Sequence, residues 1–220
     1  MRVLNFVGGL LLASAVGHSG VVTDAAGDFL STLTSLAPRA GDLDVISTSV
    51  TLSGANLLFS ATLNAPINTT PEAFYVWGID RGAGAATANF LSLGLPNIVF
   101  DAVLIVQNEG TGVVNDLTGI NGPATLGAGA VTSSGNTIQA LVPLTFLPSR
   151  GLSAAQYGFN LWPRWGGIGF SDAQISDFAP NASNAVVGAE VPEPSTVIFL
   201  GAGLGALAVL RRQRRHRRAA

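Results

Sequence analysis

Apolar and polar residues alternate along most of this chain, and this period of two limits the fold more than any other feature of the sequence. Residues 45–52 place Ile46, Thr48, Val50 and Leu52 on one side, and residues 55–63 place Leu57, Phe59, Ala61 and Leu63 on one side. Successive side chains point to opposite faces of a β-strand, so this pattern predicts two half-buried strands. Ser53-Gly54 between them predicts the connecting turn.

Four more segments have the composition of strands, and turn-forming residues separate them. These segments span residues 74–80, 98–107, 137–142 and 157–162. Clusters of glycine, asparagine and proline lie between them, as strand boundaries require. Only residues 153–156 and 85–93 have the composition of short helices. Many short strands without a long helix predict an all-β fold, an antiparallel, jelly-roll-like β-sandwich.

The composition excludes most catalytic chemistry from this predicted sandwich. The chain has no cysteine, and its two histidines, His18 and His216, lie near its ends. Thiol nucleophiles, Ser-His-Asp triads and typical zinc sites are therefore excluded there. Carboxylates remain, but nothing places Glu72 and Glu109 across a cleft as glycoside hydrolysis requires. We expect a protein that is not an enzyme, with a carboxylate-only hydrolase as the third choice of function.

The charge of the sandwich is hidden by the charge of the C-terminal end. Between Val21 and Val191, four arginines stand against twelve acidic residues, a net charge of −8, whereas the whole chain carries −2. No lysine occurs anywhere in the chain. An acidic surface of this kind argues against nucleic acid as a partner and suits cations or neutral sugars.

The C-terminal end consists of a short motif, an apolar run and a basic tail. Val191-Pro192-Glu193-Pro194-Ser195 precedes an apolar run over residues 196–210. Six arginines follow this run: Arg211, Arg212, Arg214, Arg215, Arg217 and Arg218. Residues 197–210 would make a helix of roughly 21 Å, shorter than the roughly 30 Å hydrocarbon core of a bilayer, so a buried core helix stays open. Arginines can snorkel to the membrane surface, and their position predicts a transmembrane helix with a cytoplasmic tail.

This arrangement resembles the PEP-CTERM sorting signal of Gram-negative bacteria. The residues that carry the resemblance are Pro192, Glu193 and Pro194, the apolar run and the arginine-rich end, over residues 192–218. The resemblance implies exosortase, an integral membrane cysteine transpeptidase, as the partner that cuts at or near the motif. It also implies transfer of the ectodomain to the cell surface or the exopolysaccharide matrix. The two prolines hold an extended backbone, which suits recognition by a protease. A rigid spacer beside the membrane is the alternative for this motif.

The N-terminal end predicts export. Arg2, the apolar residues 3–15 and the small residues after them are typical of a secretory signal peptide over residues 1–17. It implies the Sec translocon and signal peptidase as partners, and an uncleaved anchor is the alternative. The ectodomain then spans residues 21–180, and the polar residues 181–191 read as a linker to the anchor in the inner membrane.

A second resemblance concerns the ectodomain. Its residues lie in four segments, Asp24–Asp28, Gly41–Val45, Phe74–Asp80 and Ile175–Pro180. In these segments the chain is similar to the β-sandwiches of the DOMON and family 9 carbohydrate-binding type. The resemblance implies a jelly-roll-like sandwich, in some members with a structural calcium, and it transfers no sugar specificity.

Two groups of side chains in the ectodomain are candidates for binding. Asp24, Asp28, Asp42 and Asp44 lie in loop-like sequence near the start, and carboxylate oxygens suit Ca²⁺, although solvated loop carboxylates give the same pattern. The aromatic residues of segments 74–80 and 157–162 share strand faces, which predicts core packing. Trp162 and Trp165 are the pair that we expect to be exposed, with stacking on a ligand as their role.

The function expected from these features is that of an exported, non-enzymatic protein of the cell surface or extracellular matrix. Two targeting signals bracket the predicted sandwich, and the resemblance links the C-terminal signal to exopolysaccharide. The alternative is a membrane-tethered module that binds a carbohydrate or another small ligand.

Overall fold

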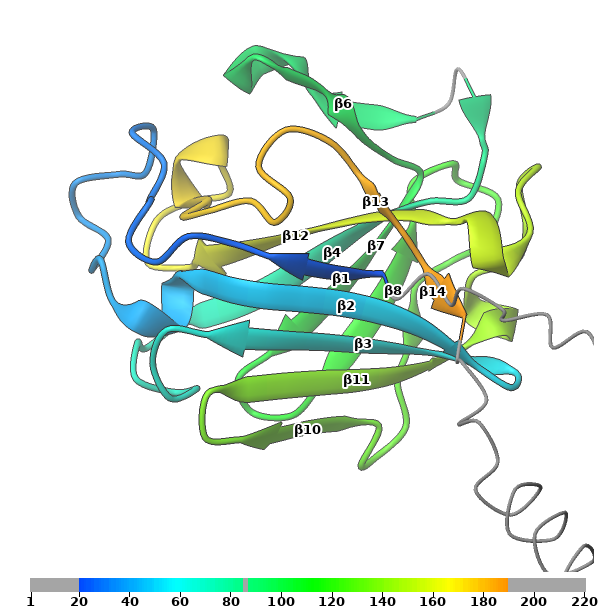
Figure 1. Ribbon diagram of the computed structural model, residues 1–220, viewed down its shortest axis with the longest axis horizontal. Helices are drawn as coiled ribbons and strands as arrows, with labels where there is room; N and C mark the ends of the chain where they lie inside the picture. The colour runs from blue at the N-terminus through cyan, green and yellow to red at the C-terminus, as the bar shows by residue number, and fades with distance from the viewer. Residues whose placement is uncertain (1–19, 85–86, 190–220) are drawn as a thin grey trace, which may run out of the picture. The chain divides into compact units, whose positions relative to one another are not determined.

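Two antiparallel sheets face each other in the computed structural model, which describes residues 20–84 and 87–189. The first sheet has the order β1 (Val21–Thr23), β2 (Val45–Ser53), β3 (Asn56–Leu63), β11 (Thr137–Pro143) and β10 (Val131–Ser134). The second has the order β13 (Ala185–Val186), β12 (Gly158–Trp165), β4 (Ala73–Asp80), β7 (Ala102–Gln107), β8 (Gly112–Asp116) and β9 (Ala124–Thr125). Figure 1 shows β2, β3, β11 and β10 in one layer, with β4, β7 and β8 in a second layer behind them. The expected all-β antiparallel sandwich is confirmed.

The main core fills the space between the two sheets. Tyr75, Trp77 and Ile79 of β4 point into it together, as their alternation predicts, and so do Phe159 and Leu161 of β12. The buried polar atoms of these aromatic side chains have partners: Trp77 Nε1 donates to Thr48 Oγ1 (3.0 Å), and Tyr75 Oη donates to the carbonyl of Asp42 (3.0 Å). Core packing of these aromatics is therefore confirmed, and each hydrogen bond fixes the position of a large side chain.

A second, smaller core lies on the outer face of the second sheet. The hairpin of β5 (Ala88–Phe90) and β6 (Leu95–Phe100) packs over β4 and β12 and buries Phe90, Ile98 and Phe100 against Trp162 and Val76. In Figure 1 this hairpin stands beyond β12, away from the first sheet. Gly78 of β4 makes room for the cluster, because a Cβ there would lie 2.5 Å from the ring of Trp162. Both faces of β4 and β12 are thus partly covered.

The strands β1, β5, β8, β9 and β10 were not predicted, and β5 lies within residues 85–93, which were expected to be helical. Three details of the predicted strands also differ from expectation. A β-bulge between Val45 and Ser47 shifts the alternation of β2, so Val45, Thr48 and Val50 are buried and Ile46 is only half-buried. Residues 98–107 form two strands, β6 and β7, because the chain breaks at the buried Asp101. The turn between β2 and β3 falls on Gly54-Ala55, one residue later than expected.

Helical structure in the described residues is limited to single 3-10 turns. They are η1 (Gly41–Leu43), η3 (Leu91–Leu93), η4 (Leu144–Phe146), η5 (Ala154–Gln156) and η6 (Asp172–Gln174). Within residues 20–84 and 87–189 no helix has the length and apolar character needed to cross a membrane. The predicted signal peptide (1–17) and transmembrane helix (196–210) lie outside the described residues.

The segment expected to be a linker contributes to the sandwich. Ala185–Val186 (β13) pairs with the edge of β12, and Gly188–Ala189 (β14) pairs with β2 in parallel. Val187 between them is buried, and its amide donates to the carbonyl of Tyr157 (2.9 Å). The paired backbone therefore extends to Ala189, beyond the expected boundary at residue 180.

Candidate functional site

Three carboxylates from distant parts of the chain meet at one edge of the sandwich. Asp24 and Asp28 flank a turn that follows β1, in which Gly27 has φ +84°. Asp177 lies in the segment that returns along β12 and bridges to it at Ile175 and Ala179. The ligand oxygens of Asp24, Asp28 and Asp177 all lie within 4.8 Å of one another. We call these three residues the acidic cluster.

Backbone and side-chain hydrogen bonds hold the acidic cluster in place. The carboxylate of Asp177 accepts hydrogen bonds from the backbone amides of Val45 (2.9 Å) and Phe178 (2.7 Å). Asn181 Nδ2 donates to Asp24 Oδ1 (3.1 Å) and Asp28 Oδ2 (3.4 Å). Because these contacts join loops that are far apart in sequence, the geometry of the cluster depends on the completed fold.

Two buried carboxylate oxygens in this region have no hydrogen-bond partner. One is Asp24 Oδ2 and the other is Oδ1 of Asp44, a residue that is 1% exposed. Asp44 Oδ2 accepts from the amide of Gly27 (2.9 Å), which ties Asp44 to the turn between the two cluster aspartates. A buried acceptor without a donor is costly unless a cation or water satisfies it.

The electrostatics of the acidic cluster favour a bound cation. Burial, with the neighbouring charges of Asp24 and Asp28, raises the pKa of Asp177 to about 8, although the hydrogen bonds from the amides of Val45 and Phe178 act in the opposite direction. Burial also raises the pKa of Asp24, to which Asp28 and Asp44 add by repulsion. Oxygen-only ligands of this kind suit hard cations. The residues present therefore fit a metal ion.

The structure changes the predicted ligand set in two ways. Asp24 and Asp28 come together and Asp44 lies next to their turn, as expected, but Asp42 belongs elsewhere. Asp42 is fully buried, and its carboxylate accepts hydrogen bonds from the amide (2.7 Å) and hydroxyl (2.5 Å) of Thr70. Asp177 was missed as a ligand because it lies far along the chain from the other aspartates, and no local spacing connects them.

Trp162 and Trp165, which the sequence predicted to be an exposed pair, are buried and half-buried, respectively. β12 continues through Trp162 and Trp165, so the pair does not leave the strand pattern. Trp162 is 2% exposed and packs on Phe90 and Phe178, and Trp165 is half-buried. The expectation of an exposed pair is therefore wrong, because the β5–β6 hairpin covers the part of the outer face that includes Trp162.

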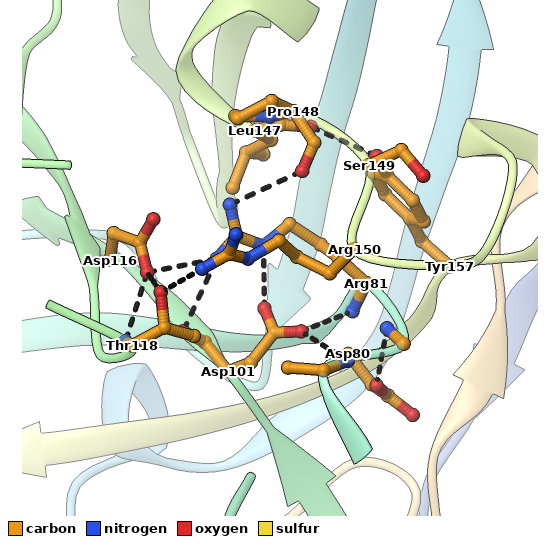
Figure 2. Close-up of polar contacts among 12 residues, drawn as sticks. Asp80, Arg81, Asp101, Asp116, Thr118, Leu147, Pro148, Ser149, Arg150 and Tyr157 are labelled. Atoms are coloured by element: carbon orange, nitrogen blue, oxygen red, sulfur yellow. Dashed lines mark hydrogen bonds and ion pairs between the residues drawn. The ribbon is translucent and has the colours of Figure 1, made fainter. Parts of the chain in front are cut away.

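A second set of buried polar side chains surrounds Arg81, a residue that the sequence analysis did not propose for any site. Figure 2 shows its guanidinium between Asp101 and Asp116: Nε lies 2.5 Å from Asp101 Oδ1, and Nη2 lies 3.1 Å from Asp116 Oδ1. Asp116 is partly desolvated, which raises its pKa, but hydrogen bonds from Thr118 and Asn121 and the charge of Arg81 hold that pKa well below its usual range. This network joins loops around the ends of β4, β7 and β8, which indicates a structural role.

The family comparison identifies the C-terminal segment. Residues 190–215 match the PEP-CTERM protein-sorting motif. The match contains Pro192, Glu193 and Pro194, the apolar run, and Arg211 to Arg215, all of which lie outside the described residues. It supports an exosortase substrate that is exported and sorted through its C-terminus, and it leaves the relatives of the sandwich open. No curated protein matches the chain.

Proposed function

We propose that this chain is a non-enzymatic protein of the bacterial cell surface or extracellular matrix. The observation that carries the proposal is the match of residues 190–215 to the PEP-CTERM motif. In the sequence this motif follows directly after the β-sandwich. A sorting signal of this kind delivers whatever domain precedes it. The role of the protein then depends on the sandwich as a stable, exported module.

The proposed route uses both ends of the chain. A signal peptide over residues 1–17 directs export through the Sec translocon, and signal peptidase removes it. The apolar run 196–210 holds the chain in the inner membrane, with the arginine tail in the cytoplasm. An exosortase-type transpeptidase then cuts near Pro192-Glu193-Pro194. Among the described residues the last strand, β14, ends at Ala189, so this cut leaves all the described strands with the released part.

The absence of an enzymatic role is supported by the composition of the sandwich. It contains no cysteine, and the histidines lie at residues 18 and 216. The buried carboxylates of Asp42 and Asp101 are engaged in hydrogen bonds that hold loops together. General acid–base chemistry would need a titratable group that is free to exchange protons with a substrate.

We propose that the sorted protein associates with exopolysaccharide. The sandwich carries four arginines against twelve acidic residues between Val21 and Val191, which suits neutral sugars better than anionic polymers. The resemblance to DOMON and family 9 carbohydrate-binding sandwiches points the same way. The second candidate is a membrane-tethered binding module for a carbohydrate or another small ligand.

Calcium is the metal that we propose for the acidic cluster, in a structural role. Asp24, Asp28 and Asp177 offer carboxylate oxygens, and Oδ1 of the adjacent Asp44 has no donor. Ca²⁺ accepts six to eight oxygen ligands in flexible geometry, which loops can supply together with water. A bound ion would join the loop after β1 to the segment that follows β12.

Cell fractionation of a motif variant tests the sorting proposal. We expect Pro192→Ala/Glu193→Ala/Pro194→Ala to stay in the inner membrane with its C-terminal tail intact, whereas the unaltered protein reaches the surface without this tail. Glu109→Ala/Pro123→Ala removes the same residue types from exposed loops of the sandwich and serves as the control. Unchanged processing of the motif variant would refute the role of the motif. Unaltered protein that stays in the inner membrane with its C-terminal tail intact would favour the tethered module.

A further inference from the structure

A cavity on the outer face of the second sheet belongs neither to the sorting signal nor to the acidic cluster. Its volume is about 410 Å³, and its walls include Phe74 and Val76 of β4, Ile105 of β7 and Trp162 of β12. Pockets that bind small molecules have volumes of roughly 300–1,000 Å³ and are mainly apolar. The cavity therefore has the size and the lining of a small-molecule site.

The register of the strands explains why this face is apolar. Trp162 lies opposite Val76, and Val76 lies opposite Ile105, so the three form one row across β12, β4 and β7. The β5–β6 hairpin covers the Trp162 end of the row: the rings of Phe90 and Phe100 lie 4.9 Å and 5.0 Å from that of Trp162. Ile105 at the other end is only half-buried. The hairpin thus covers one part of the apolar row, and the cavity occupies another.

Two exposed apolar side chains stand at the rim of the cavity. Leu117, just after β8, is 44% exposed, and Phe170, in the loop after β12, is 88% exposed. A single exposed apolar side chain is ordinary, but several around one apolar cavity mark a binding surface.

Arg164 gives the cavity one buried positive charge. It lies two residues after Trp162 on the same face of β12, and it is 4% exposed. Its Nε has no hydrogen-bond partner, and Nη1 donates to Gln174 Oε1 at 3.4 Å. The closest carboxylate oxygen, of Asp172, lies 3.7 Å from Nη2, and the ring of Phe170 lies 4.6 Å from the guanidinium carbon.

These contacts leave the charge of Arg164 incompletely compensated. The Asp172 side chain is 41% exposed, so water weakens its attraction for the guanidinium. Burial lowers the pKa of Arg164, which Asp172 only partly opposes. A buried cation with an unused donor is costly, and an acceptor on a ligand would offset that cost.

We propose that the cavity binds a small, ring-bearing molecule with one anionic head, such as an aromatic carboxylate. Its ring lies against Phe74, Ile105 and Trp162, and its head accepts hydrogen bonds from Arg164. A neutral sugar fits less well, because the walls are mainly carbon and present few polar groups. This site is separate from the sorting signal and from the acidic cluster, and the inference rests on neither.

Two matched probes test the proposal: 2-naphthoate and its uncharged analogue 2-naphthamide. Isothermal titration calorimetry on the full chain in detergent, with detergent alone as the blank, measures both affinities. We expect 2-naphthoate to bind about tenfold more tightly, because a charged hydrogen bond is stronger than a neutral one. Arg164→Met should remove this difference, with melting curves to show that the variant is folded.

A second pair of variants changes only exposed side chains, so a change in affinity cannot be attributed to loss of the fold. Leu117→Trp fills the rim and should weaken both probes by about tenfold or more, as the loss of most apolar contact predicts. Leu141→Trp is the matched control, since Leu141 is 42% exposed on β11 of the first sheet, and it should change neither affinity. Binding that Leu117→Trp leaves unchanged would overturn the site. Equal affinity of the unaltered protein for the two probes, or no binding of either, would overturn the anionic ligand.

Discussion

Individual buried charges are treated in two different ways in this protein. Arg81 is fully buried between Asp101 and Asp116, so its charge is balanced by other residues of the chain. Asp177 is buried beside Asp24 and Asp28, and none of the ion pairs among the described residues includes it. Without a counter-ion, burial and the neighbouring aspartates raise the pKa of Asp177 to about 8, so this carboxyl keeps its proton at neutral pH. A cation that displaced the proton would balance the carboxylates of the acidic cluster, which is the physical reason to expect one there.

Calcium should stabilise the protein through this cluster. At a calcium concentration of one hundred times Kd, the expected gain is about 2.7 kcal/mol, which corresponds to about 5–10 °C in Tm for a domain of this size. Asp28→Asn removes one exposed ligand and should abolish most of the shift, whereas Glu109→Gln, an exposed acid elsewhere, should retain it. Thermal unfolding with calcium and with a chelator measures this. The same Tm in both conditions would count against a calcium site.

Removal of Arg81 should be much more costly than removal of an exposed arginine. Arg81→Met leaves Asp101 buried without its counter-ion, and we expect a loss of about 3–5 kcal/mol in the free energy of unfolding. Arg39→Met is the matched control, because Arg39 is exposed, and it should change stability by about 0.5 kcal/mol or less. Denaturant unfolding of both variants checks this. Equal costs would contradict the structural role of the network.

At the scale of elements, the alternation of residues predicted the long central strands β2, β3, β4, β11 and β12 but not the short strands β1, β5, β8, β9 and β10. The inward faces of β3, β4 and β12 follow from sequence, because a pattern of period two fixes which side chains share a face. The bulge in β2 and the break at Asp101 could not be predicted, because both depend on partners far along the chain. The strands β13 and β14 were missed because two-residue strands have no period to detect.

The buried position of Val187 gives a direct test of this late segment. Val187→Ala should lower the free energy of unfolding by about 2 kcal/mol, because it removes two buried methyl groups and leaves a cavity. Val186→Ala, next to it but 57% exposed, should cost about 0.5 kcal/mol or less. Chemical denaturation of the two variants compares them. Similar small losses in both would show that the segment after residue 184 adds little to the fold.

At the scale of the whole molecule, the sequence predicted the class of fold and the PEP-CTERM sorting motif, but not how distant segments meet. The β-sandwich follows from many short amphipathic strands, and the PEP-CTERM match follows from a contiguous segment. The acidic cluster and the aromatic cavity are each assembled from strands and loops on both sides of the chain's midpoint. Such sites depend on strand order and register, which no local pattern encodes.

The intact mass of the protein in the surface fraction tests the sorting account most directly. We predict a chain that ends at or near Pro192-Glu193-Pro194 and therefore lacks both the apolar run and the arginines from Arg211 to Arg218. A surface protein whose mass still includes every residue through Ala220 would contradict cleavage at the motif, and with it the proposed role of exosortase.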